Sequence, residues 1–177
     1  AGYDRSTYEK RSEFMRGLDH SAVSQFHSFG MDTRRRYNFH LMPGSSPSGS
    51  GKGHVLLHIA GNSVQLFDLS SMSIVHTLPG LDGRGIGAVA VHPSKEFFAV
   101  GEKGENPNIY IYSYPDLVLT RVLGGGTDVA FSVLTFNSDG TKLASVGSYP
   151  DFWLTVWNWQ NESILLRSKA FSQEVFS

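Results

Sequence analysis

The stretch LTVWNW, residues 154–159, decides the fold, because two similar stretches precede it at a constant interval. They are IYIYSY at residues 109–114 and VQLFDL at residues 64–69, each 45 residues before the next one. Each stretch alternates aliphatic positions with variable neighbours and ends on aromatic or aliphatic residues, a pattern typical of β-strands. The chain therefore repeats one β-rich unit.

Turn residues divide each unit into four short segments with strand character. In the last unit these segments are residues 129–137, 142–147, 153–159 and 163–168, and Ser, Asp and Gly at 138–140 supply a tight turn. A repeat of about 40–45 residues with four strands is the signature of one blade of a β-propeller. We therefore predict an all-β fold, a partial propeller with about three four-stranded blades.

The blade boundaries follow from the same spacing. We assign blade one to residues 29–80, blade two to 81–127, blade three to 128–168 and the first strand of a fourth blade to 169–177. In blade one the predicted strands are 37–42, 54–60, 64–69 and 73–78, and in blade two they are 86–92, 96–101, 108–114 and 117–123. Propellers close with about four to eight blades, so we expect further polypeptide to complete the ring.

Two segments do not fit the repeat. Residues 1–28 are polar with scattered apolar positions, which predicts an arm that is disordered or ordered by a partner. Residues 43–53, PGSSPSGSGKG, predict a flexible insertion in blade one. A phosphate-binding loop needs Ser or Thr after its Lys and a helix behind it, but Gly53 follows Lys52, so we expect no nucleotide there.

Composition argues against several functions. The 177 residues hold 15 basic and 16 acidic side chains, which gives no bias toward nucleic acid or an anionic membrane, and no apolar run is long enough to span a bilayer. The chain has no cysteine, and its seven histidines are scattered without the spacing of metal ligands. No Ser, His and Asp can be assigned to one site. We expect no catalytic centre, metal, cofactor or small-molecule substrate.

Candidate partner contacts are few. Arg34, Arg35 and Arg36 form the densest charge cluster, which is either a solvated turn or a contact for an acidic protein surface such as tubulin. Most aromatic residues of the third strands are expected to pack between blades. Tyr110 and Trp153 have the opposite phase, so we predict that they are exposed and mark contact patches.

The blades depart from ordinary WD repeats, because Phe67-Asp68, Tyr112-Ser113 and Trp157-Asn158 replace the Trp-Asp dipeptide. With segments such as LASVGSYPD at 143–151 and KAFSQEVF at 169–176, residues 29–177 resemble the atypical WD-repeat propeller proteins of the ciliary axoneme. The resemblance is silent about residues 1–28 and about the Ser/Gly-rich insertion.

The resemblance implies tandem propellers followed by a long helical region with coiled coil. It also implies a structural tether in the axoneme of cilia and flagella, a part of the cytoskeleton. With a sister WD-repeat protein, such a tether holds the heavy chains of an inner dynein arm against the doublet microtubule and so regulates beating. The alternative is a propeller of the echinoderm microtubule-associated type, which binds tubulin directly. The resemblance transfers no individual residue as a binding site.

Overall fold

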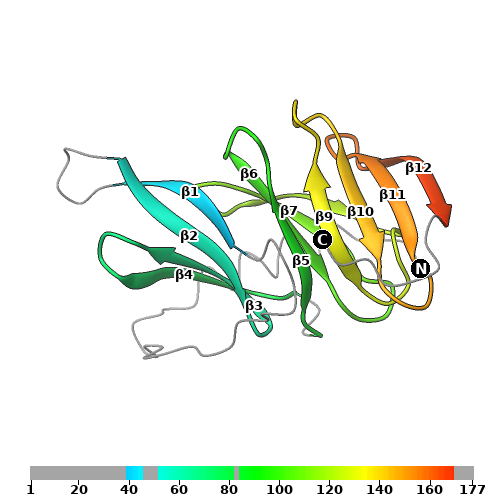
Figure 1. Cartoon of the computed structure of the whole chain (residues 1–177), viewed down its shortest axis with the longest axis horizontal. Coiled ribbons are helices and arrows are strands. Elements are labelled where there is room, and N and C mark those ends of the chain that lie inside the picture. Colours follow the sequence, from blue (N-terminus) through cyan, green and yellow to red (C-terminus); the bar gives the residue numbers. More distant parts are fainter. Residues whose placement is uncertain (1–38, 46–51, 82–83, 170–177) are drawn as a thin grey trace.

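The structure is a computed structural model that describes residues 39–45, 52–81 and 84–169, and every regular element in these ranges is a β-strand. The strands form three four-stranded antiparallel sheets, one for each repeat, and neighbours in a sheet are also neighbours in the chain. Figure 1 shows the sheets side by side in chain order, from cyan to orange. The predicted all-β fold of partial WD-repeat propeller blades is confirmed.

Each sheet is a simple meander. The first contains β1 (Phe39–Ser45), β2 (Lys52–Ala60), β3 (Ser63–Asp68) and β4 (Ser73–Pro79). The second contains β5 (Ile86–Val91), β6 (Phe97–Glu102), β7 (Ile109–Ser113) and β8 (Leu119–Leu123). The third contains β9 (Phe131–Phe136), β10 (Leu143–Gly147), β11 (Trp153–Asn158) and β12 (Ser163–Lys169). In the described part of the chain, no helix has the length and apolar character that a membrane crossing requires.

The middle sheet is buried on both faces, because successive side chains of a strand point to opposite sides. On β6, Phe98 joins the core shared with the first sheet, whereas Ala99 joins the core shared with the third. On β7, Tyr110 joins the core shared with the first sheet and Ile111 joins the core shared with the third. This explains why β5 to β7 are apolar at almost every position instead of at alternate ones.

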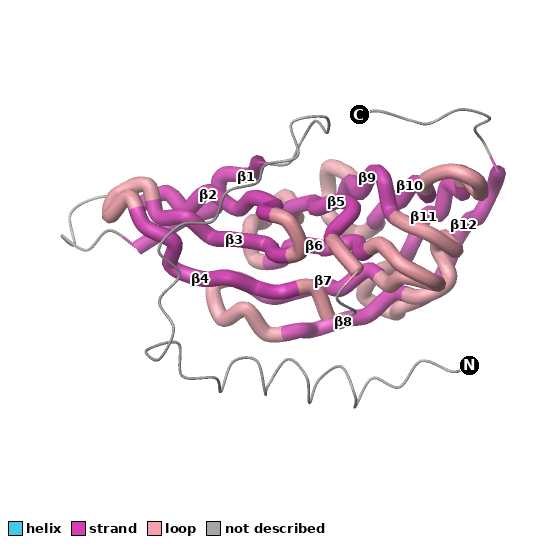
Figure 2. Tube along the Cα trace, turned by 90° about the horizontal axis from the view of Figure 1, so that it is seen from below, coloured by secondary structure: helices cyan, strands magenta, loops and turns pink. Residues whose placement is uncertain are grey.

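The two interfaces of the middle sheet are built differently. Toward the first sheet it presents large side chains, and the rings of Phe98 and Tyr112 stack with centroids 5.4 Å apart. Toward the third sheet β5 presents alanines and a glycine, so the backbones of β5 and β9 approach closely. A Cβ atom added at Gly87 would lie 2.0 Å from the carbonyl oxygen of Phe131, which only glycine allows. Figure 2 shows how closely β5 and β9 run together.

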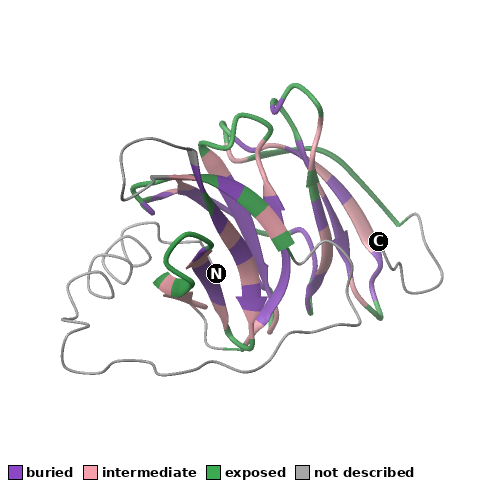
Figure 3. Ribbon diagram, turned by 60° about the vertical axis from the view of Figure 1, so that its left-hand side comes forward, coloured by how far each residue is buried: buried purple, intermediate pink, exposed green. Residues whose placement is uncertain are grey.

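The outer faces of the first and third sheets are also apolar. They belong to neither of the two cores, and they include the exposed Leu41 on β1 and Leu166 on β12. Figure 3 shows the buried stretches in purple along the central strands. The register places further apolar side chains around Leu41 and Leu166, namely Phe39, Leu56 and Phe67 on the first sheet and Val133, Leu154 and Val156 on the third. A propeller blade has this character because it normally packs against a neighbour on each side.

Some boundaries differ from those predicted. β1 and β2 remain paired as far as Ser45 and Lys52, so both ends of the predicted 43–53 loop are strand, and residues 46–51 lie outside the described part. β8 begins at Leu119 instead of Leu117, because Leu117 has a φ of 55° and so belongs to the preceding turn. Lys169, predicted as the start of a fourth blade at 169–177, is the last residue of β12, and the arm at 1–28 and residues 170–177 lie outside the described residues.

Candidate interaction surface

The candidate surface lies where β11 begins and β12 ends. Arg167 on β12 places its guanidinium carbon 4.4 Å from the centroid of the Trp153 ring on β11, a cation–π contact. The strand register pairs Trp153 with Lys169 and Thr155 with Arg167, so the four side chains share one face of the sheet. We name Trp153, Arg167 and Lys169 the cationic edge patch. Its two cations are exposed, whereas Trp153 is half-buried.

A second aromatic side chain lies close to this patch in the sequence. The β10–β11 loop carries Tyr149, whose side chain is 72% exposed. The Tyr149 ring meets the buried Phe152 ring edge to face, with centroids 6.1 Å apart. The exposed ring therefore rests on a buried one, which limits its motion.

Asp151 anchors the same loop. Its Oδ2 accepts hydrogen bonds from the Thr127 hydroxyl at 2.7 Å and from the Asp128 backbone N–H at 2.8 Å, both in the β8–β9 connection. Gly147 makes room for this pair, since a Cβ atom there would lie 2.7 Å from Thr127 Oγ1. Asp151 Oδ1 is buried without a hydrogen-bond partner in the described part of the chain. The acidic side chain thus connects the loop to the segment that enters blade three.

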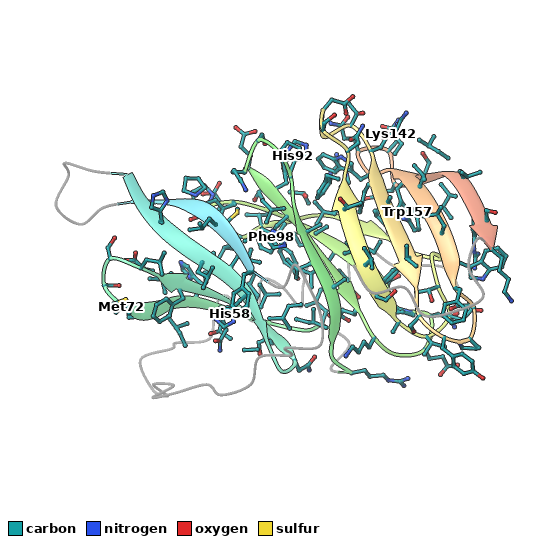
Figure 4. The ribbon with its side chains drawn as sticks, in the orientation of Figure 1. His58, Met72, His92, Phe98, Lys142 and Trp157 are labelled. Atoms are coloured by element: carbon teal, nitrogen blue, oxygen red, sulfur yellow. The ribbon has the colours of Figure 1, made fainter. Side chains whose placement is uncertain are left out.

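Two buried hydrogen bonds hold the strands behind this loop. The indole Nε1–H of Trp157 donates to Ser145 Oγ at 2.9 Å, and the Thr155 hydroxyl donates to the Gly126 carbonyl at 3.3 Å. Trp157 is almost completely buried and lies within the third sheet in Figure 4. A buried donor without its acceptor would be costly, so these bonds fix the position of β11 and with it Trp153.

At the opposite end of the sheets, His92 joins blades two and three. Its ring packs edge to face against Phe136 and Trp159, with centroid distances of 5.2 Å and 5.7 Å. Figure 4 shows His92 at the same end as Lys142, away from the middle of the molecule. No sequence motif marks this histidine, which is a packing residue at a joint between blades.

Tyr114 makes the corresponding contact between blades one and two. Its hydroxyl donates to the carbonyl of Pro43 on β1 at 2.5 Å. Burial raises the pKa of Tyr114, and the negative charge of Asp68 adds to the rise. Asp68 itself accepts hydrogen bonds from Ser70 N–H and from the Ser71 hydroxyl, and these bonds lower the pKa of its carboxyl.

The structure corrects one predicted contact and leaves another outside its range. Tyr110 was expected to be exposed but is 0% exposed, because the middle sheet has a neighbour on both faces and neither phase of β7 reaches solvent. Trp153 is half-buried and forms part of the cationic edge patch. Arg34, Arg35 and Arg36 lie outside the described residues.

Sequence reasoning missed Arg167, Tyr149 and Asp151. Arg167 could have been found from the antiparallel register, since it lies two residues before the partner of Trp153. The partners of Asp151 come from a different loop, so no local pattern marks them. Within residues 39–45, 52–81 and 84–169 there is no group of three or more side chains that could hold a metal ion.

Comparison with known proteins gives consistent matches. The chain is 44% identical over 150 residues to cilia- and flagella-associated protein 44 of Mus musculus, which covers 85% of the chain and 8% of that protein. It is also 44% identical over 154 residues to the protein of that name in Chlamydomonas reinhardtii, with 83% and 8% covered. Cilia- and flagella-associated protein 43 of Xenopus laevis is 33% identical over 126 residues, with 70% and 8% covered. No protein-family model matches the chain.

These relatives are far longer than the chain. The chain spans about 8% of the length of the curated relatives that it matches. The matched portion is large enough to include most of the three sheets, so the similarity concerns the blades themselves.

Proposed function

Because the chain belongs to the family of cilia- and flagella-associated protein 44, we propose that it is part of a non-enzymatic scaffold in the ciliary axoneme. The scaffold tethers an inner dynein arm motor to the doublet microtubule and in this way regulates beating. The observation that carries the proposal is the 44% identity across 85% of the chain, which includes most of the residues that build the three blades.

The packing of the blades suits a mechanical role. Two continuous cores join the sheets, and each fully buried aliphatic or aromatic side chain contributes about 1.5–3 kcal/mol. Hydrogen bonds also cross between blades, from Tyr114 to Pro43 and between His92 and Gly140. A tether must keep its shape under load, and an arc of sheets joined in this way resists bending at each joint.

The apolar outer faces support a larger assembly. Leu41 and Leu166 are exposed on opposite outer sheets, and sheet faces of this kind pack against further blades in a propeller. We propose that additional four-stranded sheets of the same polypeptide cover them. The length of the relatives leaves ample sequence for such blades.

The proposal is tested in a flagellated cell whose full-length protein is tagged or deleted. We expect the tagged protein to remain with the axoneme after detergent extraction, and the heads of the inner dynein arm to shift in electron tomograms of the deletion strain. Release of the tagged protein with the membrane and matrix, or unchanged arms in the deletion strain, would contradict the scaffold.

Direct tubulin binding is the alternative that a second measurement separates. Purified full-length protein is mixed with microtubules that carry no dynein and is then sedimented. We expect little co-sedimentation, because the scaffold needs its axonemal partners. Strong, salt-sensitive co-sedimentation would favour a propeller that binds the microtubule lattice.

A further inference from the structure

We propose that blades two and three move as one rigid body, whereas blade one slides on blade two by small shear motions. We name the interface between the first and second sheets joint one, and the interface between the second and third sheets joint two. Each joint lies between two described sheets, so the difference between them is a property of described residues alone. The proposal goes beyond the ciliary scaffold, because it assigns different mechanical properties to two interfaces of one arc.

Backbone hydrogen bonds fix joint two. The β6–β7 loop of blade two lies against the β8–β9 connection, where Gly104 N–H donates to the Val129 carbonyl at 2.8 Å. Two residues further along the loop, Asn106 N–H donates to the Asp128 carbonyl at 2.9 Å, and an isolated β-bridge lies beside both bonds. Hydrogen bonds weaken steeply as their angle departs from the preferred range, so adjacent backbone bonds hold the two blades at one angle and in one register.

Small residues also bring the backbones of joint two together. An added Cβ atom at Gly101 on β6 would lie 2.8 Å from Phe131 Cβ on β9, and Ala99 faces the same core. The strand registers place Ile59 and Leu57 of β2 at these two positions of the first sheet, and both belong to the core of joint one. The backbones are therefore close at joint two, whereas large side chains separate the sheets at joint one.

Joint one is held mainly by apolar packing. In the described part of the chain, no backbone–backbone hydrogen bond connects blade one with blade two. The turn between β2 and β3 contains only residues 61–62, and its Asn62 carbonyl accepts a hydrogen bond from Gly80 N–H, at the end of the same blade. The corresponding β6–β7 loop spans residues 103–108 and so reaches the next blade. Loop length is therefore the reason why the two joints differ.

The two joints respond differently to a displacement. Apolar packing has no preferred direction, so a small slide of blade one keeps most of the buried area of joint one. The backbone bonds of joint two lose their geometry under the same slide. Packed elements of proteins move past one another by such small shear steps. Load on the arc is therefore taken up at joint one, while blades two and three keep their mutual angle.

This difference gives the proposed tether a compliant element. Blade one adjusts to the movement of a partner, while blades two and three keep the surfaces that they present in fixed relative positions. The use as a compliant element rests on the proposed function, whereas the difference between the joints does not.

Pulsed electron–electron double resonance measures the two joints separately. The full chain has no cysteine, so spin labels attach to introduced cysteines alone. Met72, Asp116 and Asn161 are exposed in the corresponding turns of blades one, two and three. Met72→Cys with Asp116→Cys spans joint one, and Asp116→Cys with Asn161→Cys spans joint two. We expect the distance distribution across joint one to be broader by about 1–2 Å, the size of a shear step.

Two further variants each remove one side-chain hydrogen bond from one joint. Tyr114→Phe removes the bond from the Tyr114 hydroxyl to the Pro43 carbonyl, and we expect a further broadening across joint one. Arg121→Met removes the bond from Arg121 Nε to the Gln160 carbonyl, and we expect no change across joint two, because its backbone bonds remain. Hydrogen exchange of the unaltered protein needs no variant, and the amides that bond across joint two should exchange as slowly as those within the sheets.

Distributions of equal width, or a broader one across joint two, would overturn the proposal. The same holds if Arg121→Met broadens joint two as much as Tyr114→Phe broadens joint one, or if the amides that bond across joint two exchange as fast as those of exposed turns. None of these results bears on the axonemal tether, which the extraction and tomography experiments test separately.

Discussion

His92 and Gly140 meet across the joint between blades two and three, with His92 Nε2 lying 3.0 Å from the Gly140 carbonyl oxygen. The same oxygen accepts a hydrogen bond from Trp159 Nε1 at 2.7 Å, so one carbonyl oxygen contacts side chains of two blades. Ser94 N–H donates to His92 Nδ1, which leaves Nε2–H as the group that donates to the Gly140 carbonyl.

Replacing Gly140 should loosen this joint. Gly140 has a φ of 74°, and an added Cβ atom would lie 2.0 Å from His92 Nε2. Gly61 has a similar φ of 60° but nothing within 4 Å, so Gly61→Ala measures backbone strain alone, about 1–2 kcal/mol. We expect Gly140→Ala to lower the free energy of unfolding by about 1–3 kcal/mol more than Gly61→Ala in urea titrations. If the two variants lose the same free energy of unfolding, the His92 ring moves aside at no energetic cost, which would contradict the prediction.

Ser145→Ala should destabilise blade three by removing the acceptor for Trp157 Nε1–H. Both residues are buried, so the indole donor would lose its partner without gaining water, at about 1–3 kcal/mol. The measurement is the free energy of unfolding, followed by tryptophan fluorescence. Ser138→Ala, in an exposed turn, serves as the control and should change it by less than about 0.5 kcal/mol. A Ser145→Ala protein as stable as the control would show that another group satisfies the indole.

Asp151→Ala should release the β10–β11 loop from the segment that enters blade three. The variant loses the bonds to Thr127 Oγ1 and Asp128 N, each worth about 1.5–3 kcal/mol because the acceptor is charged. We expect faster hydrogen exchange in residues 127–129 and 148–152. Asp128→Ala is a matched control, since it removes an exposed carboxylate and keeps the backbone N–H. Unchanged exchange in Asp151→Ala would contradict the anchoring role.

Asp68 should make the turn between β3 and β4 sensitive to acid. Hydrogen bonds from Ser70 N–H and the Ser71 hydroxyl lower the pKa of Asp68 in the folded state. A lowered pKa adds stability that is present above the pKa of the unfolded state and is lost as the pH falls through the folded value. Asp68→Asn should therefore flatten the loss of stability below about pH 5, with Ser71→Ala intermediate. Thermal melts at several pH values measure the slope, and identical slopes in all three proteins would refute this role.

Tyr114 should make the stability of the fold sensitive to alkaline pH. Burial and then the charge of Asp68 raise the pKa of the Tyr114 hydroxyl in the folded state. The resulting stability is complete below the unfolded pKa, about 10, and is lost as the pH rises through the folded value. Tyr114→Phe should reduce this alkaline loss and also weaken the contact with Pro43. If the melting temperature of Tyr114→Phe falls between pH 8 and about 11 as steeply as that of the unaltered protein, this role of Tyr114 is contradicted.

The sequence was sufficient to predict the strands because the 45-residue interval between Phe67, Tyr112 and Trp157 repeats a complete blade. It was insufficient for Tyr110, since alternation along one strand does not reveal whether a sheet is covered on one face or on both. It also missed the bond between Thr127 and Asp151, which joins two loops 24 residues apart. The local sequence pattern predicts the β-strands, whereas the contacts between blades depend on the assembled fold.

The double burial of the middle sheet restricts how this chain can vary in evolution. In β5, β6 and β7 a substitution that suits one core also alters the spacing of the backbone toward the other, so neither face offers neutral positions. Inherited differences that leave the protein intact should therefore gather in the loops and in the outer sheets, and missense alleles within β5, β6 and β7 should be the ones that abolish folding.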